Sequence, residues 1–145
     1  MVAWRGHSYV TSFVLRSLIR KSTAGRSELS RDERLLYAAC EFWAAVAARS
    51  LLPLLGSGAG AQLRAFAEVL EEIGCVRTAS VLRRASFEFD GAKSPQWLRR
   101  AARALETRLL AVDESVDATL ARFAVDRIVP PLILDISTDA ADRAQ

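Results

Sequence analysis

One histidine and two cysteines are the residues whose chemistry could support nucleophilic catalysis or metal binding. His7 lies near the start of the chain, and Cys40 and Cys75 lie far apart among apolar neighbours. A structural zinc site needs four ligands, which these three residues cannot supply without unusual carboxylate help. A Ser–His–acid or Cys–His pair would have to recruit His7. We therefore expect no catalytic residues, no metal and no cofactor, and we interpret both cysteines as buried, reduced thiols.

The carboxylates give no clearer indication of catalysis. Glu71 with Glu72, and Asp113 with Glu114, belong to the densest acidic groups of the chain. Paired carboxylates perform acid–base chemistry when they are buried close together. The pattern instead predicts that Glu71 and Glu72 lie on the polar face of a helix. Asp113 and Glu114 are expected to begin the following helix, where negative charge is favourable. We therefore expect that the protein is not an enzyme.

A glycine-rich stretch at residues 56–60, GSGAG, superficially resembles a phosphate-binding loop. The lysine and hydroxyl residue that should follow such a loop are missing, and no predicted strand precedes it. We interpret the stretch as a flexible loop.

Arginines are the other chemically informative group. The net charge is +3, but residues 1–27 carry five basic residues and no acid, so the other 118 residues sum to −2. A second basic group, residues 99, 100, 103 and 108, falls in one predicted helix. Solvated basic faces explain both groups. The alternative is a nucleic-acid contact, although no recognisable DNA-reading motif accompanies it; its candidate residues are Arg16, Arg20, Arg99 and Arg103.

Helical periodicity positions these residues almost throughout the chain. The first predicted helix runs from Ser8 to about Arg20, followed by a polar linker. A capping box, Ser30 with Glu33, opens the second helix. Its apolar residues, Trp43 among them, lie nearly all around it, which predicts a central position. Pro53 limits how far this helix can continue.

The second half of the chain shows equally clear helix boundaries. A third helix ends at Gly74, where a left-handed residue would close its last turn, and a fourth must then pack back against it. Ser94 and Pro95 begin the fifth helix as N-cap and first helical residue. Residues 113–115 break or kink it before a sixth helix, which continues to about Ile128.

The chain is therefore predicted to be an all-α, single-domain bundle of about six helices. Its 145 residues suffice to bury a core. We expect a basic N-terminal helix and linker at 1–27, a helical core domain at 28–129 and a C-terminal tail at 130–145. No apolar run is long enough to cross a membrane, and no signal peptide is evident. These features predict a reducing cytoplasmic location.

Two helical motifs and one later segment resemble the bacterial DNA-mimic protein family. The first is FAEVLEEIG at residues 66–74, and the second is TASVLRRA at 78–85, with the spacing alanine–x–x–leucine–x–x–alanine. Residues 109–115, LLAVDES, precede a last helix ending near DRI at 126–128, which is similar to the C-terminal half of that family. The resemblance covers about residues 30–128. It implies the helical fold and a non-enzymatic role in binding a partner.

This chain departs from the family at its Asn-Gly-Gly-aromatic box, where residues 47–51 read AARSL and LPLLG follows. DNA mimicry requires carboxylates spaced like phosphates, whereas this chain is net basic. We therefore interpret it as a bacterial protein that binds another protein, and in the sharpest form as an inhibitor or immunity-type protein. That form rests on architectural association. A DNA mimic that binds a transcription regulator is an alternative, and a homodimer is compatible with the sequence.

The partner-binding candidates are apolar residues that could leave an exposed patch. The first predicted helix is one candidate surface. The others are the leucines around Pro53 and the tryptophan in the first turn of the fifth helix: Leu51, Leu52, Leu54, Leu55 and Trp97.

Overall fold

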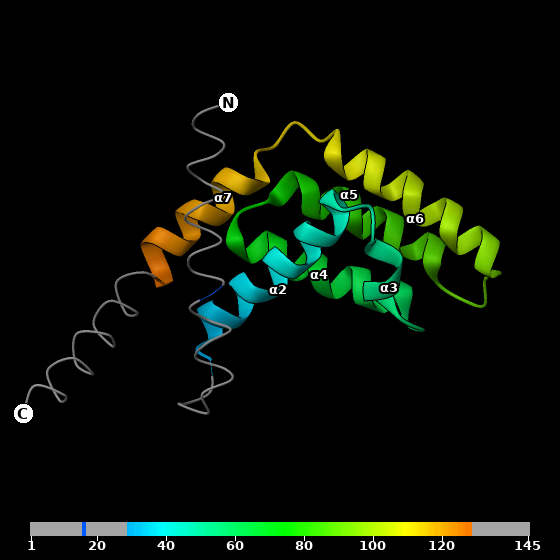
Figure 1. Ribbon diagram of the computed structural model, residues 1–145, viewed down its shortest axis with the longest axis horizontal. Helices are drawn as coiled ribbons and strands as arrows, with labels where there is room; N and C mark the ends of the chain where they lie inside the picture. The colour runs from blue at the N-terminus through cyan, green and yellow to red at the C-terminus, as the bar shows by residue number, and fades with distance from the viewer. Residues whose placement is uncertain (1–15, 17–28, 129–145) are drawn as a thin grey trace, which may run out of the picture. The chain divides into compact units, whose positions relative to one another are not determined.

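A computed structural model describes Arg16 and residues 29–128, and no β-strand occurs among them (Figure 1). The predicted all-α architecture is confirmed. The chain divides into two compact units, one of Ala38–Val116 and one of Met1–Tyr37 with Asp117–Gln145. The predicted helix at Ser8–Arg20 and the C-terminal tail at 130–145 lie outside the described residues, apart from Arg16, an exposed helical residue.

Six α-helices and two short helical turns make up the described part of the chain. The α-helices are α2 (Arg31–Ala47), α3 (Leu51–Leu55), α4 (Ala59–Ile73), α5 (Val76–Ser86), α6 (Pro95–Leu110) and α7 (Val116–Phe123). A 3₁₀ turn, η1 (Phe87–Phe89), follows α5, and a π-helical turn, η2 (Ala124–Ile128), follows α7.

The capping box at the start of α2 is present as predicted. The backbone N–H of Glu33 donates to Ser30 Oγ at 3.2 Å, and the N–H of Ser30 donates to Glu33 Oε1 at 3.1 Å. These reciprocal bonds satisfy donors that lack partners within the helix. In the unit that contains this helix start, the buried hydrophobic side chains of the described residues are Leu36, Leu120, Ala121, Ala124 and Ile128.

The end of α2 differs from the prediction. The helix ends at Ala47 because Arg49 adopts a left-handed conformation, φ 57°. The N–H of Arg49 donates to the Val46 carbonyl, and the N–H of Ser50 donates to the Ala45 carbonyl at 2.8 Å. This pattern closes the helix in the way that a C-terminal glycine usually does. Pro53 therefore does not end α2; it lies in the first turn of α3, where proline is tolerated.

The glycine-rich stretch is only partly a loop. The expectation of a loop through residues 56–60 is wrong at its end, because α4 begins at Ala59. Gly60 is buried within that first turn. A Cβ atom there would lie 2.9 Å from the Ser86 carbonyl oxygen and would overlap the Asp90 carboxylate. Gly60 therefore permits a close approach between the start of α4 and the end of α5.

The helices α4 and α5 form the hairpin that the Gly74 turn predicted (Figure 1). Gly74 has φ 118°, and its N–H donates to the carbonyls of Leu70 and Glu71. The N–H of Cys75 donates to the Leu70 carbonyl at 2.8 Å. The left-handed glycine satisfies the last carbonyls of α4 and turns the chain back at once.

The core of the Ala38–Val116 unit is built on this hairpin. Phe42 of α2 packs on Phe66 of α4, with ring centroids 4.8 Å apart. Helix α6 packs against α3 and α5. Both cysteines, Cys40 and Cys75, are buried, reduced thiols, as expected. The largest fully buried side chains of this unit are Phe42, Leu51, Leu63, Leu70, Leu82, Leu105, Leu109 and Glu106.

The start of α5 is capped by a residue from a distant part of the chain. Glu114, which follows α6, accepts hydrogen bonds from the N–H of Thr78 at 2.8 Å and of Arg77 at 3.0 Å. Burial acts to raise the pKa of Glu114, but its hydrogen bonds to Thr78 and Arg77 and the Arg77 charge outweigh burial and hold that pKa below its ordinary value. Glu114 thus acts on α5, whereas the sequence predicted that it acts on the helix that follows it.

The start of α6 follows the sequence signal directly. Ser94 Oγ accepts a hydrogen bond from the N–H of Trp97 at 3.1 Å, and Pro95 is the first helical residue. Gly91, with φ 82°, lies in the turn between η1 and α6. This local cap fixes where α6 begins and hence which of its residues face solvent.

Candidate functional site

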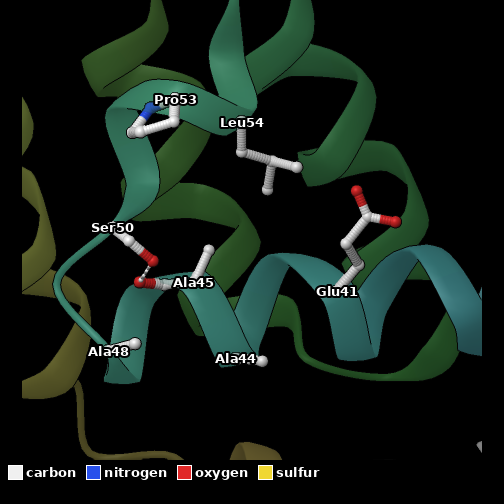
Figure 2. Close-up of a pocket in the computed structure, with 7 residues that line it drawn as sticks. All are labelled: Glu41, Ala44, Ala45, Ala48, Ser50, Pro53 and Leu54. Atoms are coloured by element: carbon white, nitrogen blue, oxygen red, sulfur yellow. Dashed lines mark hydrogen bonds between the residues drawn. The ribbon is translucent and has the colours of Figure 1, made fainter.

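A shallow apolar groove lies between α2 and α3 on the Ala38–Val116 unit. Its volume is about 530 Å³, and it is open to solvent. Figure 2 shows Leu54 pointing from α3 toward α2, with Glu41 at one end of the groove. The groove is lined by Glu41, Ala44, Ala45, Ala48, Ser50, Pro53 and Leu54.

Alanines on one side of α2 create the groove. Ala44 and Ala48 are exposed and lie one helical turn apart, and Trp43 is only half-buried. The prediction that α2 is surrounded by other helices is therefore wrong on this side. Ser50 Oγ donates to the Ala45 carbonyl at 3.5 Å, a long bond that accompanies the close of α2 (Figure 2). Small side chains leave room for a side chain or backbone from another molecule.

The leucines around Pro53 divide between the core and the groove. Leu51 is fully buried and Leu55 is 4% exposed, so these two side chains belong to the core and are not accessible for contact. Leu52 and Leu54 are half-buried, and Leu54 lines the groove. The predicted contact role therefore stays open for Leu52 and Leu54. A helix of five residues, about one and a half turns, buries one face and leaves the other at the surface.

Trp97 is half-buried and lies outside the groove. Its ring meets Phe89 edge-on, with centroids 5.3 Å apart, and Lys93 Nζ lies 4.9 Å from its centroid. These contacts hold the ring against the start of α6. Its role as a partner-binding residue remains a prediction.

Four guanidinium groups form a second surface, which we call the α6 arginine strip: Arg49, Arg99, Arg100 and Arg103. Helical geometry places Arg99, Arg100 and Arg103 within an arc of about 100° on the exposed side of α6. Arg49 reaches the same helix from the end of α2, where its Nη1 donates to Thr107 Oγ1 at 2.7 Å. Thr107 lies one turn beyond Arg103, and its hydroxyl donates to the Arg103 carbonyl at 3.1 Å. The strip therefore continues along two turns of α6.

The strip has no acidic partner among the described residues. The salt bridges of this unit join other arginines instead: Arg64 to Asp90, Arg77 to Asp113 and Arg83 to Glu71. The only carboxylate in the α6 sequence, Glu106, is 1% exposed, and its Oε2 has no hydrogen-bond partner. Guanidinium groups that lack nearby carboxylates keep their positive potential at the surface.

The four arginines predicted as nucleic-acid contacts do not all lie on one described surface. Arg99 and Arg103 belong to the strip, and Arg16 is exposed on a helix. Arg20 lies outside the described residues. Sequence reasoning did not identify Arg49, because only the left-handed turn after α2 brings its side chain to α6.

Four carboxylates of this unit are engaged in contacts with arginines or with the backbone of α5. Glu71, Asp90 and Asp113 pair with arginines, and Glu114 caps α5. A phosphate-like array needs carboxylates that are available to a partner's cations. Exposed carboxylates outside these pairs include Glu41 at the groove, and Glu68 and Glu88 elsewhere on the unit.

Two further properties concern the described residues only. No helix in residues 29–128 is long and apolar enough to cross a membrane. Within the same residues, no three metal-ligating side chains come together. His7, the only histidine of the chain, lies outside them.

The fold and the two surfaces define an all-α helical protein with an apolar groove and a basic strip. The model of the DMP19-like protein family matches residues 27–127, which is more than half of the chain. The chain therefore belongs to the DMP19-like protein family, the DNA-mimic family that the sequence resembles. No curated protein matches the chain, and no solved structure matches it either.

Proposed function

We propose that this chain is a non-enzymatic protein that binds another protein through the α2–α3 groove. The observation that carries the proposal is the groove itself, an apolar hollow open to solvent on a unit whose own core is already filled. Contiguous exposed apolar surface in a folded protein commonly marks an interaction site. Burial of both cysteines supports the non-catalytic part of the proposal, because buried thiols are poor nucleophiles.

The occupant that the groove fits is one amphipathic helix of a partner protein. Ala44 and Ala48 allow a helix to approach closely, and Leu54 and Pro53 offer apolar contact beside them. Glu41 favours a Lys or Arg of the partner at the groove's end. A cationic partner agrees with membership of a DNA-mimic family, whose members are expected to bind DNA-binding proteins.

The sharper form of the proposal is an inhibitor or immunity-type protein that occupies a functional surface of its partner. A partner that is a transcription regulator would instead make the chain a DNA mimic in function. The identity of the bound protein separates these two forms. Groove binding is the mode of contact we propose, because four carboxylates of the described unit, Glu71, Asp90, Asp113 and Glu114, already have partners within the fold.

The test combines partner capture with groove variants. Tagged full-length protein is used to retain a partner from the source cell's lysate at low and high salt, with a nuclease-treated sample. The purified partner is then titrated against Ala44→Arg and Ala48→Arg, which place a large charged side chain in the groove. We expect each variant to weaken binding at least about tenfold, since both block the apolar contact.

Ala61→Arg is the matched control, because Ala61 is exposed on α4 outside the groove. It should bind the partner as tightly as the parent does. A partner that binds the groove variants and the control equally would overturn the proposed site.

A further inference from the structure

The α6 arginine strip is the strongly charged surface that the proposed function does not use. We propose that the strip binds the phosphate backbone of double-stranded nucleic acid. This activity is separate from protein binding in the α2–α3 groove, which is lined by none of the four arginines.

The positive charge of the strip is not compensated by carboxylates in the described part of the chain. Arg49, Arg99, Arg100 and Arg103 have no carboxylate within salt-bridge distance among the described residues. In the same unit, Arg64 is held by both oxygens of Asp90, at 3.1 Å each. A guanidinium that is already paired has less to gain from a phosphate, whereas the strip can accept four anionic groups.

The charges of the strip are regularly spaced along α6. Arg99 and Arg103 are one helical turn apart, about 6 Å along the axis, and Thr107 extends the row by the same step to the Arg49 guanidinium. A row of guanidinium groups at regular intervals fits a polyanion with regularly repeated charges. The Arg49–Thr107 bond fixes the end of the row to α6.

The composition of the strip indicates nucleic acid rather than an acidic protein. Between the arginines, the exposed side of α6 presents Gln96, Ala104 and Thr107. Protein interfaces usually contain an apolar centre with aromatic residues, whereas interfaces with DNA are polar and strongly positive. Leu110, which is 42% exposed, lies at the end of the helix, beyond the four arginines.

The lack of an open aromatic platform among the described residues of α6 indicates a duplex rather than a single strand. Single-stranded nucleic acids are usually held by stacking of bases on exposed aromatic side chains. Trp97 is the only aromatic residue of α6, and its half-buried ring already contacts Phe89 and Lys93. Phosphate contacts alone are largely independent of sequence, so we expect little sequence preference.

The test measures binding of the full-length protein to a labelled DNA duplex by fluorescence anisotropy between about 50 and 200 mM salt. With four phosphates neutralised, the slope of log K against log salt should be at least about 3 in magnitude. The variant Arg99→Gln/Arg100→Gln/Arg103→Gln should weaken binding at least about tenfold at low salt and reduce the slope by about 3. A single strand of the same length should bind less tightly.

The control is Arg84→Gln/Arg122→Gln/Arg127→Gln, which removes the same charge from three exposed arginines outside α6. It should retain most of the affinity. Equal losses in both triple variants would overturn the proposal, because binding would then follow net charge or the N-terminal basic residues. The α6 triple variant should lose more affinity for the duplex than for a poly-glutamate peptide; a loss confined to this peptide would overturn the proposal in favour of an acidic protein partner.

The groove variants separate this proposal from the proposed function. When Ala44→Arg or Ala48→Arg is combined with the α6 triple variant, the loss of DNA affinity caused by the α6 substitutions should be the same as in the parent. The α6 triple variant should still bind the protein partner, so either proposal can fail while the other holds.

Discussion

Arginines of the α4–α5 hairpin differ from those of the α6 arginine strip in what surrounds them. Arg64, Arg77 and Arg83 each meet a carboxylate of the same unit. The Arg83 pair joins the two helices of the hairpin, and the other two connect the hairpin to Asp90 after η1 and to Asp113 after α6. The strip faces solvent with no such partner among the described residues. The comparison teaches that identical side chains stabilise the fold in one region and remain available for binding in the other.

The largest loss of stability is expected where a substitution disturbs the backbone of the region with paired arginines. Gly60→Ala places a methyl group 2.9 Å from the Ser86 carbonyl and against the Asp90 carboxylate that holds Arg64. We expect a loss of about 1–3 kcal/mol in the free energy of unfolding, because α4 must move away from the end of α5. Denaturation by urea measures this loss. Gly58→Ala is the control, since nothing lies within 4 Å of the added methyl group.

A smaller loss should follow from removal of the α5 cap. Glu114→Ala leaves the N–H groups of Arg77 and Thr78 without their carboxylate, and Thr78 is buried. The expected cost is about 1–2 kcal/mol in the free energy of unfolding, as for other helix caps. Thermal unfolding of this variant should be compared with that of Glu88→Ala, an exposed carboxylate. If Glu114→Ala and Glu88→Ala lose similar amounts of stability, the hydrogen bonds of Glu114 to α5 do not stabilise the fold more than an exposed carboxylate does.

The same contact should make stability depend on pH. The folded-state pKa of Glu114 lies below its ordinary value of 4.5, so its contribution is fully present above that value and is lost as the pH falls through the folded-state pKa. The difference in unfolding free energy between the parent and Glu114→Gln should therefore shrink as solutions are acidified. Urea denaturation at a series of acidic pH values measures this difference. A difference in unfolding free energy that grows as the pH falls would contradict a lowered pKa for Glu114.

Arg49 allows the two roles of arginine to be separated in one side chain. Arg49→Gly removes the cost of a left-handed non-glycine residue, about 1 kcal/mol, and loses the exposed bond to Thr107. We expect a net gain of about 0.5 kcal/mol in stability together with a weaker dependence of DNA binding on salt. Arg49→Ala keeps the strained backbone and loses the bond, so it should be less stable than the parent. Calorimetry and the anisotropy titration test both expectations.

The smallest effect on stability should come from the strip itself. Arg99→Gln/Arg100→Gln/Arg103→Gln removes three charges that have no partner in the fold, so the unfolding free energy should change by less than about 0.5 kcal/mol. Arg83→Gln, which breaks a pair with Glu71, is the comparison on the hairpin. A triple variant that unfolds more readily than Arg83→Gln by more than about 1 kcal/mol would mean that the strip is structural.

Local signals in the sequence predicted the helices well because each depends on adjacent residues. The capping box at Ser30, the N-cap at Ser94 and the glycine stop at Gly74 all occur as expected. Periodicity along α6 also indicated that Arg99 and Arg103 share an exposed side. These features need no knowledge of what packs against the helix.

Features that depend on distant parts of the chain could not be predicted in this way. The end of α5 approaches Gly60 so closely that a side chain there would clash, and Glu114 caps a helix that begins 38 positions earlier in the sequence. The groove arises from which side of α2 is left uncovered, and Arg49 joins the strip through a turn that usually requires glycine. Leu51 and Leu55 were interpreted as surface residues because an apolar run alone does not reveal which side is buried.

The separation between α5 and its cap has a consequence during protein synthesis. Gly74 can close the end of α4 as soon as it leaves the ribosome, because every group in that turn is a near neighbour in the chain. Thr78 must wait until Glu114, 36 residues later, has also been made. At about 5–20 residues per second, the nascent hairpin spends on the order of seconds with the start of its second helix uncapped. A chaperone or protease that acts on unfinished chains would meet the hairpin in that interval.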